Sequence, residues 1–385
     1  MGSRNLSRVR DAAGRGLKRL RVLHIDSGRE WRGGQRQVLL LAEGLRRRMH
    51  DPLILAPPGS PLLQRAQAAG LETEPLAMRG DWDLRAALTV RNRIQESEID
   101  IVHAHDGRSH AIARVSLIGM SHPPLVVTRR VPFVPKAARL KYGNRVTRFI
   151  AVSQAVSDAM AAAGIERKRI LMVHSGVEEP PADLVPRDWR SELGWPTDSV
   201  ICGVVGAMTA EKGVAELAAI ANAMRPETRA RARILLLGGE RQGEVNIGGA
   251  VGYSAGFIED IIPAVAGMDV LWHPARAEGL GTAVIDAMAV GVPPIAFAVG
   301  GIGEVVENET SGLLVQPEDV AAFAISADRL IDDEQLRASL ARAAKARARM
   351  FSAAAMTQAT EAVYHQLLSG SEKHSSPPIL RSTSA

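Results

Sequence analysis

Short apolar runs alternate along most of the chain with longer stretches in which hydrophobic residues recur at helical spacing. An apolar run between helical stretches is typical of a buried strand in a parallel sheet that helices cover. The pattern predicts one α/β domain over residues 21–180, with a helix at 35–48. Its strands are expected at residues 21–25, 52–56, 99–103, 125–128, 149–152 and 170–173.

The pattern stops at residues 178–186 and then begins again. That segment is acidic and rich in proline and has neither a helix nor a strand period, so it is predicted to link two domains. A second α/β domain is expected over residues 181–350. Its strands are expected at 200–205, 234–237, 270–273 and 294–297, and its helices near 214–224, 258–266, 282–289 and 301–307, with further helices from 317.

The segment with the most informative chemistry is residues 278–286, Glu-Gly-Leu-Gly-Thr-Ala-Val-Ile-Asp. Gly279 and Gly281 let the backbone approach a ligand closely and open a helix, whose first N–H groups attract anions. Glu278 and Asp286 add carboxylates that accept hydrogen bonds from hydroxyl groups. Because a sugar nucleotide carries both phosphates and hydroxyls, this segment predicts a nucleotide-sugar site.

Open parallel sheets bind ligands at the carboxyl ends of their strands. In the second domain this rule selects the loops at 206–213, 238–239, 256–259 and 276–286, and in the first domain those at 28–35 and 103–106. Two sheets whose ligand-binding ends face each other across a linker would form a deep cleft. Such a cleft suits a reaction of two substrates, one bound by each domain.

The motifs in these loops resemble those of the retaining glycosyltransferases of family 4. In the second domain the resemblance is carried by residues 205–213, 255–260, 268–286 and 299–315, and in the first domain by 33–35, 100–105, 150–153 and 174–177. It covers residues 21–368 and implies the GT-B fold, in which two Rossmann-like parallel-sheet domains face each other across a cleft. It further implies an acceptor domain at 21–180, a donor domain at 181–350 and a C-terminal helix at 351–368 that crosses back to the N-terminal domain.

The resemblance also assigns roles to particular residues. His105, Lys212 and Glu278 are the implied catalytic residues: His105 bonds the transferred sugar, Lys212 meets the donor diphosphate and Glu278 lies near the donor sugar. Asp286 occupies the place of the acid that binds the ribose, although aspartate is one methylene shorter than the usual glutamate. Glu304 marks a further, weaker candidate. The implied donor-binding set is Gly33, Gly34, Gly206, Lys212, Gly256, Phe257, Glu278, Gly279, Leu280, Gly281, Thr282 and Asp286.

One position departs from the family pattern. The family usually has an arginine at the diphosphate where this chain has Ala207. Loss of that cation would cost about 2–4 kcal/mol of leaving-group stabilisation if no other group replaced it. The replacement could come from arginines of the first domain, namely Arg29, Arg32, Arg36, Arg129 or Arg130. A phosphorylated or carboxylated acceptor could instead use Arg32, Arg36, Arg129 and Arg130.

The implied reaction transfers a sugar from a nucleoside-diphosphate sugar, the co-substrate, to an acceptor hydroxyl with retention of anomeric configuration. No cofactor and no metal are expected, because this fold uses side chains and helix dipoles instead. The acceptor is expected to be a lipopolysaccharide core or another bacterial glycolipid, with a soluble saccharide as the alternative. Two other functions stay open on the same fold: a sugar-nucleotide 2-epimerase, and a nucleotide-sugar-binding protein without activity.

Charge is concentrated at the start of the chain. Residues 1–21 hold seven basic side chains and one acidic side chain, while the net charge of the whole chain is only +5. Residues 1–20 form a basic leader with weak helical spacing, which predicts either a solvated segment or a helix on an anionic membrane. With one cysteine and no apolar run long enough to span a bilayer, the chain is expected to be cytoplasmic or peripheral on the cytoplasmic face of the inner membrane. Nucleic-acid binding is disfavoured, and residues 369–385 are expected to be disordered.

Overall fold

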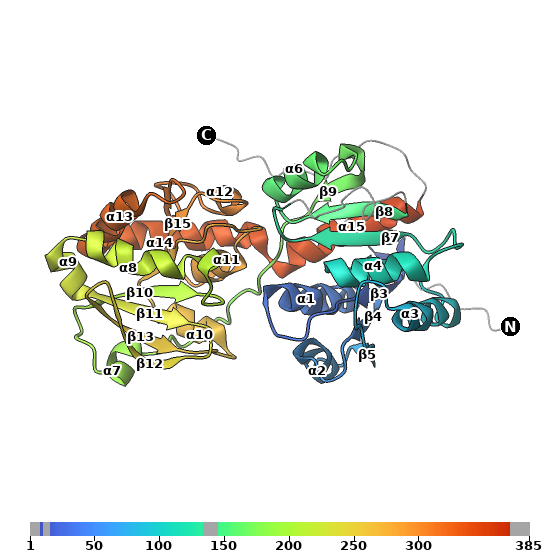
Figure 1. The fold of residues 1–385 in the computed structure, drawn as a ribbon, viewed down its shortest axis with the longest axis horizontal. Coiled ribbons are helices and arrows are strands. Elements are labelled where there is room, and N and C mark those ends of the chain that lie inside the picture. The colour runs from blue at the N-terminus through green and yellow to red at the C-terminus, as the bar shows by residue number, and fades with distance from the viewer. Residues whose placement is uncertain (1–7, 11–15, 134–144, 370–385) are drawn as a thin grey trace.

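The structure is a computed structural model that describes residues 8–10, 16–133 and 145–369. Two α/β domains lie side by side along the long axis of the molecule, each built on a seven-stranded sheet (Figure 1). The predicted fold class, two Rossmann-like parallel-sheet domains, is confirmed. No helix among these described residues is long and apolar enough to cross a membrane.

The sheet of the N-terminal domain is parallel throughout, in the order β5-β4-β3-β6-β7-β8-β9. The order reverses between β3 and β6, and this switch point brings together the loops that follow these two strands. Its strands are β3 (Arg21–Ile25), β4 (Asp51–Ala56), β5 (Glu72–Pro75), β6 (Ile101–Ala104), β7 (Leu125–Arg129), β8 (Val146–Ala151) and β9 (Ile170–Met172). Its helices are α1 (Gly33–Arg47), α2 (Pro61–Ala68), α3 (Leu84–Glu96), α4 (Gly107–Ser116) and α6 (Gln154–Ala162).

Strand β3 carries apolar residues on both of its faces. Leu23 belongs to the hydrophobic cluster that includes Val90 of α3 and Ile112 of α4. Val22, on the opposite face, belongs to the cluster that includes Leu41 of α1. Because helices cover both faces, the strand has no solvent side, and a continuous apolar run is the expected sequence.

The sheet of the C-terminal domain has the order β12-β13-β11-β10-β14-β15-β16, with β12 antiparallel to its neighbour. Its switch point lies between β10 and β14. The strands are β10 (Val200–Val205), β11 (Ala232–Leu237), β12 (Gln242–Ile247), β13 (Ala250–Ala255), β14 (Val270–His273), β15 (Pro294–Phe297) and β16 (Leu313–Val315). The helices are α7 (Trp189–Leu193), α8 (Val214–Ala223), α9 (Pro226–Arg231), α10 (Ile261–Ala266), α11 (Thr282–Ala289), α12 (Ile302–Val305), α13 (Val320–Asp332) and α14 (Glu334–Ala348), with short turns η1 (Arg167–Arg169) in the N-terminal domain and η2 (Ala210–Lys212) and η3 (Arg349–Phe351) here.

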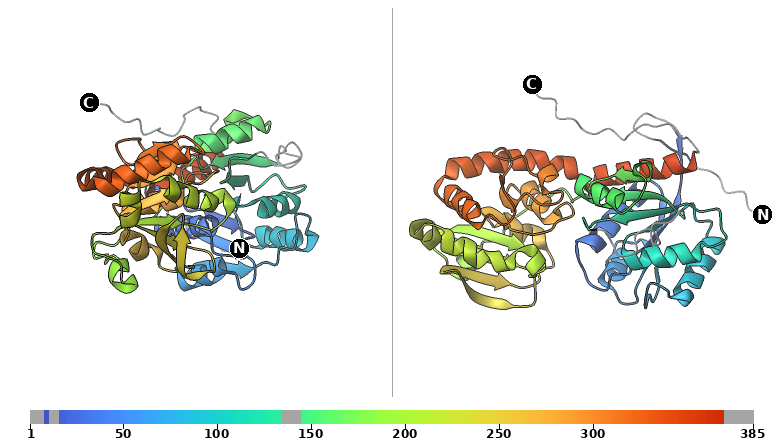
Figure 2. Two further views of the ribbon diagram at one scale, coloured as in Figure 1. Left: turned by 60° about the vertical axis from the view of Figure 1, so that its left-hand side comes forward. Right: turned by 45° about the horizontal axis from the view of Figure 1, so that its top comes forward.

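The last helix, α15 (Ala353–Leu368), packs on the N-terminal domain, so the predicted crossing helix is confirmed. Figure 2 shows α14 and α15 in orange and red, following one another along both domains. Buried bonds hold α15 in place: Tyr364 lies 2.6 Å from Nδ1 of His103, and Glu361 lies 2.7 Å from Nε2 of His50. The two chain crossings between the domains are themselves bonded, since Val177 exchanges backbone hydrogen bonds of 2.8 Å with the segment at 351–353.

Several elements differ from the prediction. The leader was expected to be either a solvated segment or a basic amphipathic helix on a membrane, but residues 8–10 and 16–18 form the antiparallel strands β1 (Arg8–Arg10) and β2 (Gly16–Lys18), so the helical alternative is wrong there. The other leader residues and 370–385 lie outside the described residues. The β12–β13 hairpin and β5 were not predicted. β5 has the polar sequence Glu-Thr-Glu-Pro and lies at the edge of its sheet, where apolar residues are not required.

Candidate active site between the two domains

Two helix N-termini from different domains meet where the domains touch. Helix α1 begins at Gly33 and α11 begins at Thr282, and a Cβ on Gly33 would lie only 3.4 Å from Oγ1 of Thr282. Neither N-cap residue, Arg32 or Gly281, caps its helix with a side chain. The partial positive charges of two helix ends therefore converge on one place, which favours an anionic ligand.

Beside this place, Lys212 and Glu278 form an ion pair of 2.5 Å. Lys212 ends the turn after β10, and Glu278 lies on the loop after β14, so the pair spans the switch point of the C-terminal sheet. His273, the last residue of β14, places Nε2 3.3 Å from the same Glu278 oxygen. Burial by itself would raise the pKa of Glu278, but His273 and Lys212 outweigh it and lower this pKa to about 2. Glu278 is therefore ionised at neutral pH.

A second ion pair crosses the cleft between the domains. Nη1 of Arg36, on the first turns of α1, donates to Oδ2 of Asp286 on α11 at 2.6 Å. Glu178 lies 3.5 Å from the same guanidinium. The other carboxylate oxygen of Asp286, Oδ1, is buried and has no hydrogen-bond partner among the described residues. Burial raises the pKa of Asp286, and the charge of Arg36 partly offsets this effect.

His105 lies just after β6 and is buried, with only 4% of its surface exposed. Arg130 donates to the His105 carbonyl at 2.7 Å and lies 3.3 Å from Nδ1 of its ring. Nε2 lies 3.0 Å from Nδ1 of His24. Since arginine can only donate, Nδ1 of His105 accepts and Nε2 carries the proton towards His24. Burial, with smaller contributions from His103 and Arg130, holds the pKa of His105 well below its usual value, so the ring is neutral.

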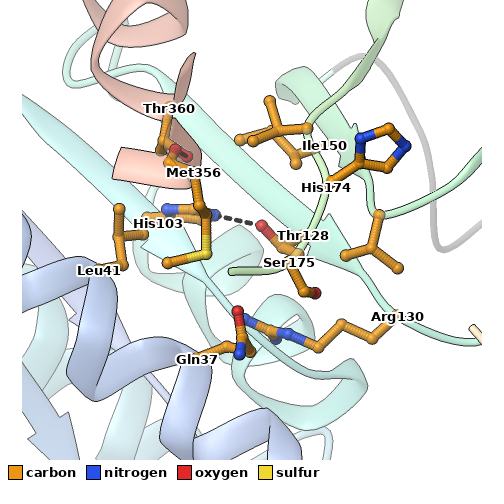
Figure 3. Close-up of a pocket in the computed structure, with 12 residues that line it drawn as sticks. Gln37, Leu41, His103, Thr128, Arg130, Ile150, His174, Ser175, Met356 and Thr360 are labelled. Atoms are coloured by element: carbon orange, nitrogen blue, oxygen red, sulfur yellow. Dashed lines mark hydrogen bonds between the residues drawn. The ribbon is translucent and has the colours of Figure 1, made fainter. Parts of the chain in front are cut away.

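A narrow cavity of about 20 Å³ lies between the sheet of the N-terminal domain and α15, and Figure 3 shows residues that line it, His103 among them. Thr128 lies 2.7 Å from Nε2 of His103, and Arg130 extends along the cavity towards Gln37. A cavity of this size holds about one water molecule and no sugar. His103, whose ring bonds to Tyr364 and Thr128, thus belongs to the interior of the N-terminal domain.

A larger cavity, of about 320 Å³, lies at the carboxyl ends of β3, β4 and β5. Its opening on the N-terminal domain agrees with the predicted side for an acceptor. The lining residues are Arg29, Pro57, Pro58, Gly59, Ser60 and Ala77.

Four of the glycines predicted for the donor site, Gly206, Gly256, Gly279 and Gly281, occupy positions that exclude larger residues. A Cβ on Gly279 would lie 1.9 Å from the carbonyl oxygen of Arg130, so the two domains touch here through their backbones. Gly206, Gly256 and Gly281 have φ angles of 142°, 68° and 95°, values that L side chains rarely adopt.

The remaining predicted residues are distributed more widely. Leu280 is part of the core and Phe257 is 57% exposed. Gly34 has open space around it. Among the arginines predicted for the acceptor, Arg32 pairs with Glu30 on the exposed loop.

Arg129 and Arg130, the other predicted acceptor arginines at the end of β7, differ in their surroundings. Arg129 is partly exposed and packs on Phe133, 5.9 Å from the ring centre. Arg130 is hydrogen-bonded to His105. Arg36, which belongs to the same predicted acceptor set, lies on the donor side of the site instead.

Sequence reasoning missed four residues that shape the site: His24, Asp26, Asp106 and His273. Asp26 accepts hydrogen bonds from Gly28 at 2.8 Å and from Gln35 at 2.9 Å, which fixes the loop before α1. Burial, followed by the charge of Asp106, raises the pKa of Asp26. The signal was present, because Asp26 directly follows β3 and His273 ends β14, both at the carboxyl ends of strands.

Two groups of described residues bring enough nitrogen and oxygen atoms together to consider a metal ion: His24, His103 and His105, and His50, Glu361 and His365. In each group ring nitrogens serve hydrogen bonds, but Nε2 of His24 and Nε2 of His365 have no hydrogen-bond partner among the described residues. In the first, ring nitrogens bond to each other and to Tyr364 and Thr128. In the second, Nδ1 of His50 accepts from the Leu20 amide at 3.1 Å while Nε2 bonds Glu361.

Comparison with known families adds an independent result. The model for "Glycosyltransferase Family 4" matches residues 31–179, and the model for "Glycosyl transferases group 1" matches residues 199–333. The two matches fall on the two domains and together include α1, Lys212, Glu278 and Asp286. The chain belongs to the family 4 (group 1) glycosyltransferases.

Named members of the family are distant relatives. A D-inositol 3-phosphate glycosyltransferase of Mycolicibacterium smegmatis is 28% identical over 305 residues, which cover 74% of this chain and 66% of that protein. Another, from Salinispora tropica, is 42% identical but over only 94 residues, 24% of this chain and 20% of that protein. The chain spans about half the length, or less, of several relatives that it matches.

Solved structures confirm the GT-B fold. Anabaena Alr3699/HepE in complex with UDP-glucose superposes with a TM-score of 0.76 at 20% identity, over 89% of this chain and 99% of that one. WaaG, a glycosyltransferase involved in lipopolysaccharide biosynthesis, superposes with a TM-score of 0.67 at 14% identity, over 91% and 100%. At these identities the likeness establishes the fold of this family member and nothing finer.

Proposed function

We propose that the protein is a retaining glycosyltransferase that moves a sugar from a nucleoside-diphosphate sugar to an acceptor hydroxyl. The observation that carries the proposal is the convergence of the α1 and α11 N-termini beside the Lys212–Glu278 pair. Diphosphate, ribose and sugar of the donor each find suitable chemistry there: helix ends and a lysine for the phosphates, Asp286 for ribose hydroxyls, and Glu278 for sugar hydroxyls.

The proposed reaction takes place on one face of the sugar. The bond between the anomeric carbon and the diphosphate oxygen breaks, and the acceptor oxygen bonds the same carbon from the same side. The acceptor proton passes to an oxygen of the departing β-phosphate. The products are a glycoside with retained configuration and a nucleoside diphosphate.

The side chains have separate parts in this proposal. Lys212 and the helix N-termini stabilise the negative charge that grows on the leaving diphosphate. Glu278, ionised and fixed by His273, accepts hydrogen bonds from the sugar. His105 orients the sugar, for which its Nδ1 would exchange Arg130 for a hydroxyl donor. Since these groups compensate the charge, we expect activity without a divalent metal.

The test is incubation with a panel of UDP-, GDP-, ADP- and CMP-sugars in the presence of EDTA, followed by NMR of the product. Slow donor hydrolysis or transfer with retained configuration is expected. An inverted product would refute the retaining mechanism, and activity that requires added metal would refute the metal-free one. An epimerised nucleotide sugar would reveal a 2-epimerase, and binding without turnover a protein that only binds its ligand.

For the acceptor we propose an anionic saccharide or glycolipid, as in the synthesis of lipopolysaccharide or another envelope glycolipid. The cavity with Arg29 at its wall supports an acceptor with a phosphate or carboxylate. The name of the D-inositol 3-phosphate glycosyltransferases includes a phosphorylated acceptor, and WaaG acts in lipopolysaccharide biosynthesis. An anionic acceptor of either kind would be compatible with the positive charge of this cavity.

A glycolipid acceptor would require contact with a membrane, and helix α3 offers a surface for it. Trp82, Leu84 and Leu88 are 83%, 65% and 59% exposed, and the two leucines lie one turn apart on the same face. Arg79 and Arg85 are exposed beside them. Exposed apolar side chains flanked by cations suit the interface of an anionic bilayer. We propose peripheral attachment of the N-terminal domain through this face.

The triple variant Trp82→Ser, Leu84→Ser, Leu88→Ser is expected to bind vesicles of phosphatidylglycerol and phosphatidylethanolamine at least about tenfold more weakly than the wild type, because burial of even one such side chain contributes about 1.5–3 kcal/mol. Co-sedimentation measures the bound fraction. Ile325→Ser serves as the control, since Ile325 is 67% exposed but lies on α13 of the other domain. Equal binding by the wild type and the triple variant would contradict the attachment through α3.

A further inference from the structure

The donor site of the C-terminal domain contains little positive charge for a diphosphate. Lys212 is already paired with Glu278, and Arg276 is paired with Glu216 of α8. Ala207, in the loop after β10, contributes no charge. With Glu278 and Asp286 also present, a diphosphate would meet more negative than positive side-chain charge unless a cation came from the other domain.

Arg36 is placed to supply that cation. It lies three residues into α1, the helix whose N-terminus meets that of α11. Its side chain is only 16% exposed and reaches across the cleft to Asp286. We propose that Arg36 is the second cation of the diphosphate site, and that its ion pair with Asp286 is a placeholder which the donor displaces. This inference rests on the proposed function.

The chemistry of the two partners favours such an exchange. Oδ1 of Asp286 is buried without a partner, and a buried acceptor that makes no hydrogen bond is costly. The ribose of a nucleotide has two neighbouring hydroxyls, which can donate to both oxygens of one carboxylate. They would satisfy Oδ1 and release Oδ2 from Arg36. The freed guanidinium has a planar set of donors that matches the oxygens of a phosphate.

The exchange also accounts for the two ion pairs of the donor site. In the structure, each acid at the donor site has a cation next to it, Lys212 for Glu278 and Arg36 for Asp286. When the donor binds, its diphosphate takes over both cations and its hydroxyls take over both acids. Both cations then stay paired with a negative charge and both carboxylates keep hydrogen-bond donors, so none of these buried charged groups is left without a partner.

Calorimetry with UDP and uridine tests the inference, with GDP and guanosine or ADP and adenosine in their place if the wild type prefers another base. Arg36→Ala is expected to weaken binding of the diphosphate about 10–100-fold, the loss of about 1.5–3 kcal/mol for hydrogen bonds to a charged group. Binding of the nucleoside should not weaken, because it has no phosphate for Arg36 to bind and its ribose no longer has to displace Arg36 from Asp286. Arg36→Lys keeps the charge without the fork and should fall between wild type and Arg36→Ala.

Two further variants make the result specific. Arg47→Ala removes an exposed arginine from the same helix and should leave both affinities at the wild-type level. Ala207→Arg in the Arg36→Ala background should restore binding of the diphosphate, because it returns a cation to the loop after β10. Equal loss of diphosphate and nucleoside binding in Arg36→Ala, or no loss of either, would overturn the inference. A wild type that binds none of the three diphosphates would instead overturn the proposed function, and the inference with it.

Discussion

Lys212→Ala is expected to lower the rate of donor hydrolysis, kcat, by about 10²–10³-fold, the usual effect of removing one group that stabilises developing negative charge. The charge on the leaving diphosphate grows as its bond to the sugar breaks, and the Lys212 ammonium is the cation closest to Glu278 on that side of the cleft. Hydrolysis of the nucleotide sugar needs no acceptor, so the measurement does not depend on knowing the acceptor.

Measuring kcat and KM separately identifies the reason for the lower rate of hydrolysis. A lysine that acts on the transition state lowers kcat, whereas one that only holds the ground-state diphosphate raises KM and leaves kcat unchanged. Lys168→Ala is the control, because Lys168 is 75% exposed and lies on the surface of the N-terminal domain. A variant at Lys212 that keeps wild-type kcat would contradict the proposed role.

The pairing with Glu278 adds a second expectation to the same experiment. Removing Lys212 takes away one of the groups that lower the pKa of the buried Glu278 carboxylate, so this pKa should rise from about 2. In the double variant Lys212→Ala, Glu278→Gln, the stability lost in the single variant should be partly recovered without recovery of the rate. The contribution of this ion pair to stability would then be distinguished from its contribution to the rate.

The donor side of the site could be predicted from sequence because its residues lie on loops of a single sheet. Lys212 follows β10 and Glu278 follows β14, and the switch point between these neighbouring strands brings their loops together. The apolar runs locate the strands, so the positions of both side chains follow from local patterns. The glycines at positions 206 and 281 are also visible in the sequence, and glycine is the residue that readily adopts the positive φ angles found there.

Contacts between the domains could not be predicted in this way. Arg36 and Asp286 are 250 residues apart, and no period in the sequence fixes how one sheet is set against the other. That arrangement depends on the crossing at Val177, on α15 and on the approach of Gly279 to the Arg130 backbone. The sequence therefore predicts Arg36 as one of several arginines, and only the structure distinguishes it from Arg32.

The buried histidines were hidden for a related reason. His24 lies within an apolar strand, where its ring replaces a hydrophobic side chain, and its partner His105 directly follows the neighbouring strand β6. The parallel pairing of β3 with β6 makes them neighbours, but a single histidine in an apolar run carries no signal of that pairing. The helix considered for the leader was wrong for a different reason, because pairing between β1 and β2 outweighs the weak helical spacing of this segment.

The same histidines predict that the N-terminal domain loses stability as the pH falls below about 6.5. Burial lowers the pKa of His24 from 6.5 to about 3, and it lowers the pKa values of His103 and His105 in the same direction. Between these values the unfolded chain binds protons that the folded domain does not. The stabilisation is therefore fully present above the unfolded pKa and is lost as the pH falls towards the folded one.

For His24 alone, the free energy of unfolding should fall by about 2 kcal/mol between pH 7.5 and pH 5, since each pH unit below 6.5 contributes about 1.36 kcal/mol. Urea unfolding at a series of pH values measures the slope. His24→Asn can still accept a hydrogen bond from His105 but cannot titrate, so its slope should be smaller by about one proton.

Asp26 and Asp286, whose pKa values burial raises, act in the opposite direction and cancel in this comparison. His122→Gln changes an exposed histidine and should keep the wild-type slope. If His24→Asn also kept it, the proton that destabilises the domain would have to bind elsewhere, and the neutral, bonded ring of His24 would no longer explain how His105 is held in place.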